Sequence, residues 1–72
     1  MQKYDYSKLL GRMKECGFTQ VELAKRIGIS ETSINLTLRN KRDFRQDEIT
    51  NVASTLDIAP EDIPTYFFAH RL

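Results

Sequence analysis

The sequence predicts an all-α fold of five short helices, and two observations carry that prediction. Apolar residues recur at spacings of three and four, which places them on one face of a helix. Between these stretches lie residues that begin or end helices, namely serine, threonine, glycine and proline. We expect helices over residues 6–15, 20–27, 31–38, 46–56 and 60–63 of one domain, 1–72.

The first helix is expected to begin near Asp5, whose carboxylate can accept hydrogen bonds from free N–H groups of the first turn. Gly17 should end it, because glycine tolerates the left-handed conformation that commonly closes a helix. The apolar face of this helix should consist of Tyr6, Leu9, Leu10 and Met13.

The second helix has the clearest local start signal in the chain. Thr19 is placed as its N-cap, and Glu22 stands three residues later, where its side chain can bond back to the Thr19 backbone in a capping box. Phe18 and Leu23 occupy the positions of a hydrophobic staple across this start. The helix should run to Ile27.

A short turn then leads to the third helix. Gly28 breaks the chain, Ser30 is placed as the next N-cap, and Ile29 and Ile34 repeat the staple pattern. A turn this short keeps consecutive helices from lying antiparallel, so they should cross steeply, as in a helix-turn-helix unit over about 19–38. Ile34 and Leu38 should face inward.

Residues 39–45 carry four bases and one acid around Phe44 and lack helical periodicity, which predicts a basic loop with one aromatic anchor. Asp47 and Glu48 then suit the positive N-terminal end of the fourth helix. The apolar stripe of that helix should be Ile49, Val52, Ala53 and Leu56.

Pro60 suits the first position of a short fifth helix, and Pro64 is expected to stop that helix after Ile63. The tail, 64–72, is open to three interpretations: it packs on the core, forms an edge strand, or meets another subunit. Its aromatic residues are Tyr66, Phe67 and Phe68.

The charges are unevenly distributed along the chain. The net charge is only +1, but residues 1–45 hold ten of the eleven bases and five acids, whereas 46–72 hold one base and five acids. This asymmetry indicates a directed basic face. A solvated surface of scattered charges is the alternative.

Catalytic and metal chemistry find little support. Cys16 is the single cysteine and His70 the single histidine, so we expect neither an internal disulfide nor a zinc site. We also expect that the protein binds no cofactor and is not an enzyme. The chain opens without an apolar run and nowhere has 18 apolar residues together. We therefore expect a cytoplasmic protein with no membrane span.

Residues 19–34 resemble the helix-turn-helix of phage repressor and Cro-like proteins, and residues 4–9, 40–44 and 46–49 extend the resemblance to small Cro-like proteins of lactococcal temperate phages. Among these the chain is most similar to the modulators of repression. The resemblance implies a lambda-repressor/Cro-like fold in the bacterial host cell. It also implies antirepressor activity, in which the protein pairs with the phage's main repressor and favours lytic growth.

The same resemblance implies a binding face on the second and third helices. Gln20 would contact a phosphate, while Glu31, Thr32, Ser33 and Asn35 would face base edges. Chemically, asparagine can read adenine, and serine or threonine can bond to several bases. The backbone of the DNA would be held by Arg39, Asn40, Lys41 and Arg42. The alternative is that these are merely solvated residues.

The third helix departs from a strong DNA reader in one respect: the positions expected to be exposed from Glu31 to Thr37 include no arginine or lysine. It therefore lacks a guanine reader, and Glu31 adds negative charge near phosphates. Thr37 stands where such domains usually bury an aliphatic residue, with Leu38 expected to substitute. Leu36 would give a protein interface an apolar contact.

Three hypotheses follow. The first is an antirepressor that binds the N-terminal DNA-binding domain of the phage's CI-type repressor. The second is a Cro-like repressor that binds operator double-stranded DNA through the third helix, and the third is a structural adaptor. Alone, the chain is expected to be a monomer or weak dimer.

Overall fold

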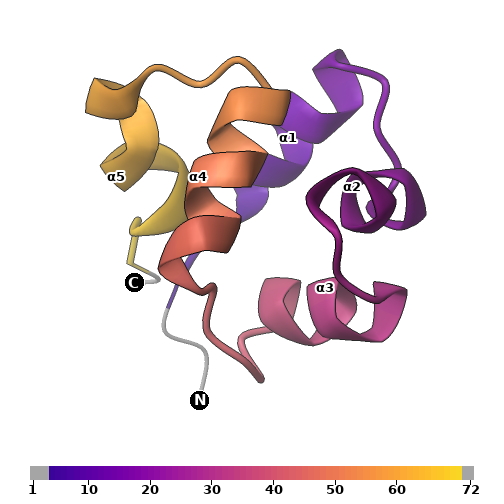
Figure 1. Ribbon diagram of the computed structural model, residues 1–72. Helices are drawn as coiled ribbons and strands as arrows, with labels where there is room; N and C mark the ends of the chain where they lie inside the picture. The colour runs from indigo at the N-terminus through magenta and orange to yellow at the C-terminus, as the bar shows by residue number, and fades with distance from the viewer. Residues whose placement is uncertain (1–3, 71–72) are drawn as a thin grey trace.

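The computed structural model describes residues 4–70, and within them the all-α fold expected from the sequence is confirmed (Figure 1). The described chain forms α1 (Ser7–Glu15), α2 (Gln20–Ile27), α3 (Glu31–Leu38), α4 (Gln46–Thr55), the 3-10 helix η1 (Pro60–Asp62) and α5 (Ile63–Phe67). The second and third helices have the expected bounds. The first begins one residue later than expected and the fourth ends one residue earlier.

Helix α4 lies between the α2–α3 pair and α5, so it contributes to the core from a central position (Figure 1). Helix α2 contacts both α3 and α4, while α1 contacts α5. The side chains of Leu9, Leu23, Ile34, Val52 and Leu56 have no exposed surface. The inward face predicted for α1 is wrong at one position, because Leu10 is 41% exposed.

The capping signals of α2 and α3 are confirmed in detail. The Thr19 N–H donates to Glu22 Oε1 (3.1 Å), and the Glu22 N–H donates to Thr19 Oγ1 (3.2 Å). Gly28 closes α2 with a φ of 80°, and Ser30 Oγ accepts from the Ser33 N–H (3.0 Å). Local sequence therefore fixes both ends of the turn between the two helices.

The start of α1 differs slightly from the expectation. The Asp5 carboxylate accepts from the Ser7 N–H (2.9 Å), but Tyr6 occupies the N-cap position. At the other end Cys16 is the C-cap and Gly17 follows it with a φ of 77°. The predicted helix-ending role of this glycine is confirmed.

The fifth helix corrects the sequence analysis. Pro64 does not end a helix after Ile63; it lies in the first turn of α5, which runs to Phe67. A proline is tolerated in a first turn because the N–H groups there have no partner within the helix. The predicted helix 60–63 is instead η1 followed by the start of α5, with Pro60 at the first position of η1 as expected.

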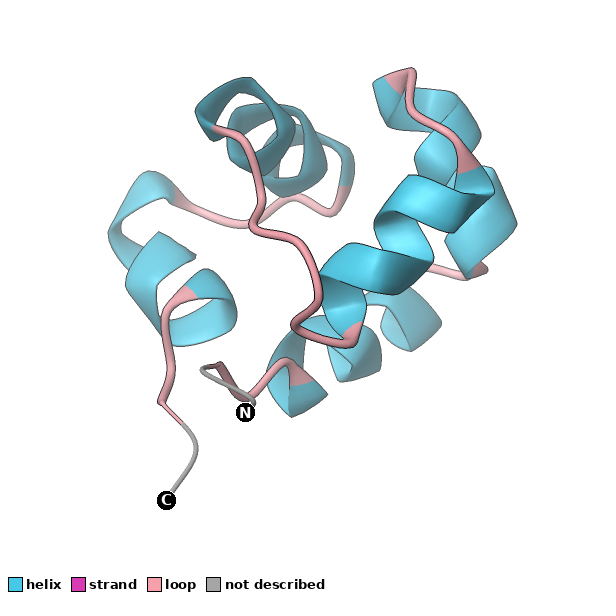
Figure 2. Cartoon of the chain, turned by 90° about the horizontal axis from the view of Figure 1, so that it is seen from below, coloured by secondary structure: helices cyan, strands magenta, loops and turns pink. Residues whose placement is uncertain are grey.

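The tail packs on the core and returns to the start of the chain. Phe67 is 1% exposed, whereas Phe68 remains 43% exposed. Tyr4 and His70 form an antiparallel β-bridge, and the Asp5 N–H donates to the Ala69 carbonyl (2.7 Å). The two ends of the described chain therefore lie side by side (Figure 2). Among residues 4–70, no helix has the length and apolar character needed to cross a membrane.

Candidate functional site

The exposed side of α3 carries a shallow hollow of about 210 Å³, lined by Glu31, Thr32, Asn35 and Leu36. We call it the α3 hollow. Glu31 and Thr32 are exposed, whereas Asn35 and Leu36 are half-buried. These residues face outward because Ile34 and Thr37, on the other side of the helix, are buried. The structure thus brings together four of the residues expected to form the binding face.

Gln20 and Asn35 connect the two helices of the face. The Asn35 Nδ2 donates to Gln20 Oε1 (3.3 Å), which links the start of α2 to the middle of α3. This bond occupies one amide hydrogen of Asn35 and leaves its carbonyl oxygen to accept from a partner. Gln20 is half-buried and acts partly as a support for Asn35.

Ser33 is tied to the start of its own helix. Its hydroxyl accepts from the Ser30 hydroxyl (2.9 Å), and its backbone N–H donates to the same Ser30 oxygen. It is half-buried and does not line the α3 hollow. Its interactions explain a structural role; a contact with a partner stays a prediction.

Thr37 corrects the expected pattern of exposure on α3. Its side chain is fully buried, its hydroxyl donates to the Ser33 carbonyl (2.8 Å), and it accepts from Arg42 Nη1 (2.8 Å). Leu38 is half-buried and packs against the core beside it, so it does not take the place of Thr37. A buried hydroxyl is tolerated here because both of its hydrogen bonds are made.

Arg42 is half-buried, and its guanidinium is bound to the fold. Its guanidinium donates to both carboxylate oxygens of Glu48, at 2.9 Å and 2.6 Å. Glu48 is 3% exposed and also accepts from the Arg45 N–H (3.0 Å). The hydrogen bonds from the Arg42 side chain lower the pKa of Glu48 below its ordinary value, and the hydrogen bond from the Arg45 backbone N–H acts in the same direction.

This ion pair corrects two expectations from the sequence. Arg42 was expected to hold a phosphate, but its guanidinium is already paired with Glu48. Glu48 was expected to be a simple charge at the start of α4, and it is instead a buried acceptor. One sequence signal could have indicated it: Glu48 stands three residues after the N-cap Arg45, the position from which a carboxylate bonds back to the cap.

Asn40 also has an internal role. It has a φ of 62°, and its side chain bonds both backbone groups of Tyr4: the Tyr4 N–H donates to Oδ1 (2.9 Å), and Nδ2 donates to the Tyr4 carbonyl (3.0 Å). Arg39 and Lys41, its neighbours, are exposed. Of the four residues expected to hold a DNA backbone, these two remain available to a partner.

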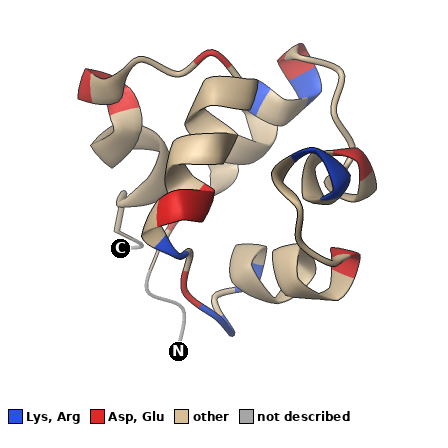
Figure 3. Ribbon diagram, in the orientation of Figure 1, with Lys and Arg blue, Asp and Glu red and all other residues tan. Residues whose placement is uncertain are grey.

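Acidic and basic residues lie at opposite ends of α3 (Figure 3). Acid lies at the first turn, at Glu31, and helix residues 31–38 contain no base. The exposed bases follow the helix, at Arg39 and Lys41. The face is therefore acidic and polar over the α3 hollow and basic at the loop beyond it.

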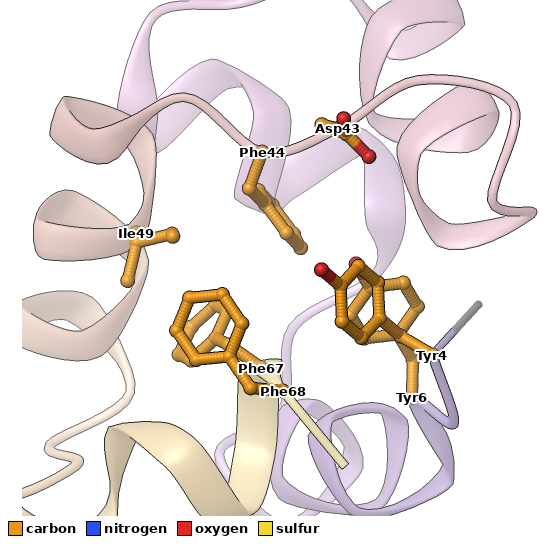
Figure 4. Close-up of a pocket in the computed structure, with 7 residues that line it drawn as sticks. All are labelled: Tyr4, Tyr6, Asp43, Phe44, Ile49, Phe67 and Phe68. Atoms are coloured by element: carbon orange, nitrogen blue, oxygen red, sulfur yellow. The ribbon is translucent and has the colours of Figure 1, made fainter. Parts of the chain in front are cut away.

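A second cavity, of about 230 Å³, was not predicted from the sequence. It lies where the start of the chain, the basic loop and α5 meet (Figure 4). Burial raises the pKa of the Tyr6 hydroxyl to about 12, and Tyr4 and Asp43 add to the shift. The residues that line this cavity come from four separate segments of the chain: Tyr4, Tyr6, Asp43, Phe44, Ile49, Phe67 and Phe68.

Residues 4–70 contain no group of three histidine, cysteine, aspartate or glutamate side chains able to hold a metal ion. Cys16 is half-buried, and its Sγ lies 3.7 Å from the Leu56 carbonyl oxygen.

Comparisons with known proteins agree with the fold. No curated protein matches the chain. Among solved structures, the chain is similar to the solution structure of the modulator of repression of the temperate bacteriophage TP901-1 from Lactococcus lactis. The two are 42% identical with a TM-score of 0.77, over 92% of this chain and 89% of that one. A family model described as "Protein of unknown function (DUF739)" matches residues 2–70, and the chain belongs to that family.

Proposed function

We propose that this protein is an antirepressor of a phage genetic switch. In this proposal it binds the N-terminal DNA-binding domain of a CI-type repressor through the exposed side of α2 and α3, and so keeps the repressor from its operator. Its site of action is the cytoplasm of the bacterial host. The basis for the class of function is the similarity, at 42% identity, to a modulator of repression.

The observation that carries the mode of action is the charge of the α3 hollow. A DNA-reading helix approaches a dense row of phosphates, and affinity for that row comes mainly from lysine and arginine. Here the helix presents the Glu31 carboxylate and no base from 31 to 38. A repressor surface built to bind DNA is basic, and such a surface complements this carboxylate.

The internal roles of Arg42 and Asn40 weaken the case for direct DNA binding further. With Arg42 paired to Glu48 and Asn40 bonded to Tyr4, the exposed bases at the end of α3 are Arg39 and Lys41. Few phosphate contacts give weak binding with a small dependence on salt. Operator binding by the isolated chain remains the second candidate, and these two exposed bases favour it.

A gel-shift titration tests the proposal. Operator DNA is mixed with the repressor, and the purified protein is then added in increasing amounts, with a parallel titration that omits the repressor. The antirepressor predicts that the repressor shift disappears while the protein alone produces no specific shift. If the protein alone shifts operator DNA specifically at nanomolar concentration, and Asn35→Ala abolishes this shift, the result would instead support a Cro-like repressor that binds DNA directly.

A charge reversal separates the two candidates by sign. Glu31→Lys should weaken repressor binding at least tenfold, because it places a base opposite a basic surface, and should raise nonspecific affinity for DNA. The control is Glu61→Lys, which makes the same charge change in η1. The helix that follows η1, α5, lies on the opposite side of α4 from the α2–α3 pair (Figure 1). Calorimetry with the repressor's N-terminal domain measures both variants. Wild-type affinity in Glu31→Lys would mean that the repressor binds another surface.

A further inference from the structure

We propose that the α3 hollow is a socket for one arginine of the repressor, the arginine that otherwise reads guanine in the operator. The Glu31 carboxylate takes the place of the guanine edge. The inference rests on the proposed antirepressor function and specifies how that function excludes DNA.

The two oxygens of the Glu31 carboxylate offer an arginine the same kind of acceptor pair as the edge of guanine. Arginine reads guanine by donating two parallel hydrogen bonds to O6 and N7. A carboxylate offers two oxygens that accept the same fork of donors. Within the described part of the chain no hydrogen bond or ion pair engages the Glu31 carboxylate, whereas Glu15 and Asp47 have basic partners. The pair of acceptors at the hollow is therefore ready for an external donor.

The rest of the hollow favours arginine over a simple ammonium group. Asn35 is oriented by its bond to Gln20, so its carbonyl oxygen can accept a third hydrogen bond one turn along the helix from Glu31. Thr32 adds a hydroxyl, and Leu36 supplies an apolar wall for the methylene stem of a long side chain. A planar guanidinium with five donors can use these separated acceptors together, which a point charge cannot.

The sign of the charge at the hollow argues against DNA as the occupant. At about 210 Å³ the hollow is a local depression on one helix with room for one side chain. A phosphate would approach the unpaired Glu31 carboxylate and be repelled by it. An arginine bound here cannot bind guanine at the same time, so the socket competes directly with the base contact that gives the operator its specificity.

A double-mutant cycle tests the socket. Glu31→Gln in this protein, which removes the charge and keeps the side-chain length, is combined with alanine substitution of each major-groove arginine in the repressor's N-terminal domain. Calorimetry measures all complexes. We expect Glu31→Gln to lower affinity at least tenfold, and one arginine to show coupling, so that its removal costs much less when Glu31 is already Gln. Glu61→Gln is the matched control and should leave affinity unchanged.

The possible outcomes distinguish failure of the arginine socket from failure of the proposed antirepressor function. If the wild-type chain binds the repressor but Glu31→Gln binds equally well, or no arginine couples to Glu31, the socket is rejected and the antirepressor stands. If the wild-type chain does not bind the repressor at all, both are rejected. Thermal melting of each variant confirms that the compared proteins are folded.

Discussion

The substitution Glu48→Gln tests whether the ion pair beneath the basic loop stabilises the fold. Glu48 accepts three hydrogen bonds, two from the Arg42 guanidinium and one from the Arg45 N–H. Glutamine keeps the shape of the side chain but has one acceptor oxygen, and its amide hydrogens would face the guanidinium. The variant therefore loses the 2.6 Å contact between Arg42 Nη2 and Glu48 Oε2 and leaves the guanidinium without a counter-charge.

The expected loss follows from the burial of the pair. Breaking a buried ion pair by changing one partner costs about 3–5 kcal/mol, and a hydrogen bond to a charged group is worth about 1.5–3 kcal/mol. The Arg42 side chain is 26% exposed, so water can compensate part of its lost partner. We expect Glu48→Gln to lower the free energy of unfolding by about 2–3 kcal/mol, which is below the cost of breaking a fully buried pair and within the range for a hydrogen bond to a charged group.

Thermal and urea denaturation, followed by circular dichroism at pH 7, measure this loss. In a domain of this size about 2 kcal/mol corresponds to a fall in Tm of about 8–16 °C. Glu61→Gln, an exposed change in η1, is the matched control and should leave Tm nearly unchanged. An equal Tm for Glu48→Gln and wild type would show that the carboxylate is not held by Arg42 in solution.

The pH dependence gives an independent check. The pKa of Glu48 is lower in the folded protein than its unfolded value of about 4.3. A depressed carboxyl pKa contributes stability that is present above the unfolded pKa and is lost as the pH falls through the folded pKa. The stability gap between wild type and Glu48→Gln should therefore be constant from pH 6 to 8 and close below about pH 4.3. A gap that persists at acid pH would contradict the assignment.

Three further substitutions test the fold around the site. Leu23→Ala should lower the free energy of unfolding by about 2–5 kcal/mol because it leaves a cavity in the core, and an unchanged urea midpoint would contradict the register of α2. Gly28→Ala should lower the free energy of unfolding by about 1–2 kcal/mol. An added Cβ meets nothing within 4 Å, so the loss comes only from the φ of 80°, which a residue with a Cβ disfavours. A variant as stable as wild type would mean that the turn relaxes. The pKa of Tyr6, about 12, lies above its unfolded value, so its contribution to stability is present below about pH 10 and is lost as the pH rises toward 12. Tyr6→Phe should remove that alkaline loss, as measured by denaturation between pH 8 and 11.

What the sequence predicted well is what neighbouring residues decide. The cap at Thr19, its partner Glu22 and the turn at Gly28 lie within ten residues of one another, and their chemistry sets the bounds of α2. The inward positions Leu23 and Ile34 follow from the same local pattern, because each stands at the staple position of its helix, where an apolar residue packs on the residue before the N-cap.

What the sequence analysis missed depends on contacts between distant segments, or on a choice that local rules leave open. Asn40 bonds the backbone of Tyr4, 36 residues earlier, a contact that no local pattern contains. Pro64 is compatible with either the end of one helix or the first turn of another, and the packing of Phe67 on the core favours the second. The burial of Thr37 is tolerated because its hydroxyl bonds the Ser33 carbonyl and the Arg42 guanidinium, and the helical pattern of apolar residues does not reveal these two partners.

The same contacts distinguish the residues at the end of α3 and in the basic loop that are bonded to the fold from those that stay exposed. Arg42 binds Glu48 beneath the loop, and Asn40 binds the start of the chain, so the loop is anchored to the fold at two positions that flank Lys41. Arg39 and Lys41, which flank Asn40, are thereby held at the exposed end of α3. Anchoring reduces the conformational entropy that these bases lose when they meet a partner. Under the proposed antirepressor function, a basic pair fixed at one end of α3 and an acid at the other would orient the repressor, whose acidic and basic groups must match both ends.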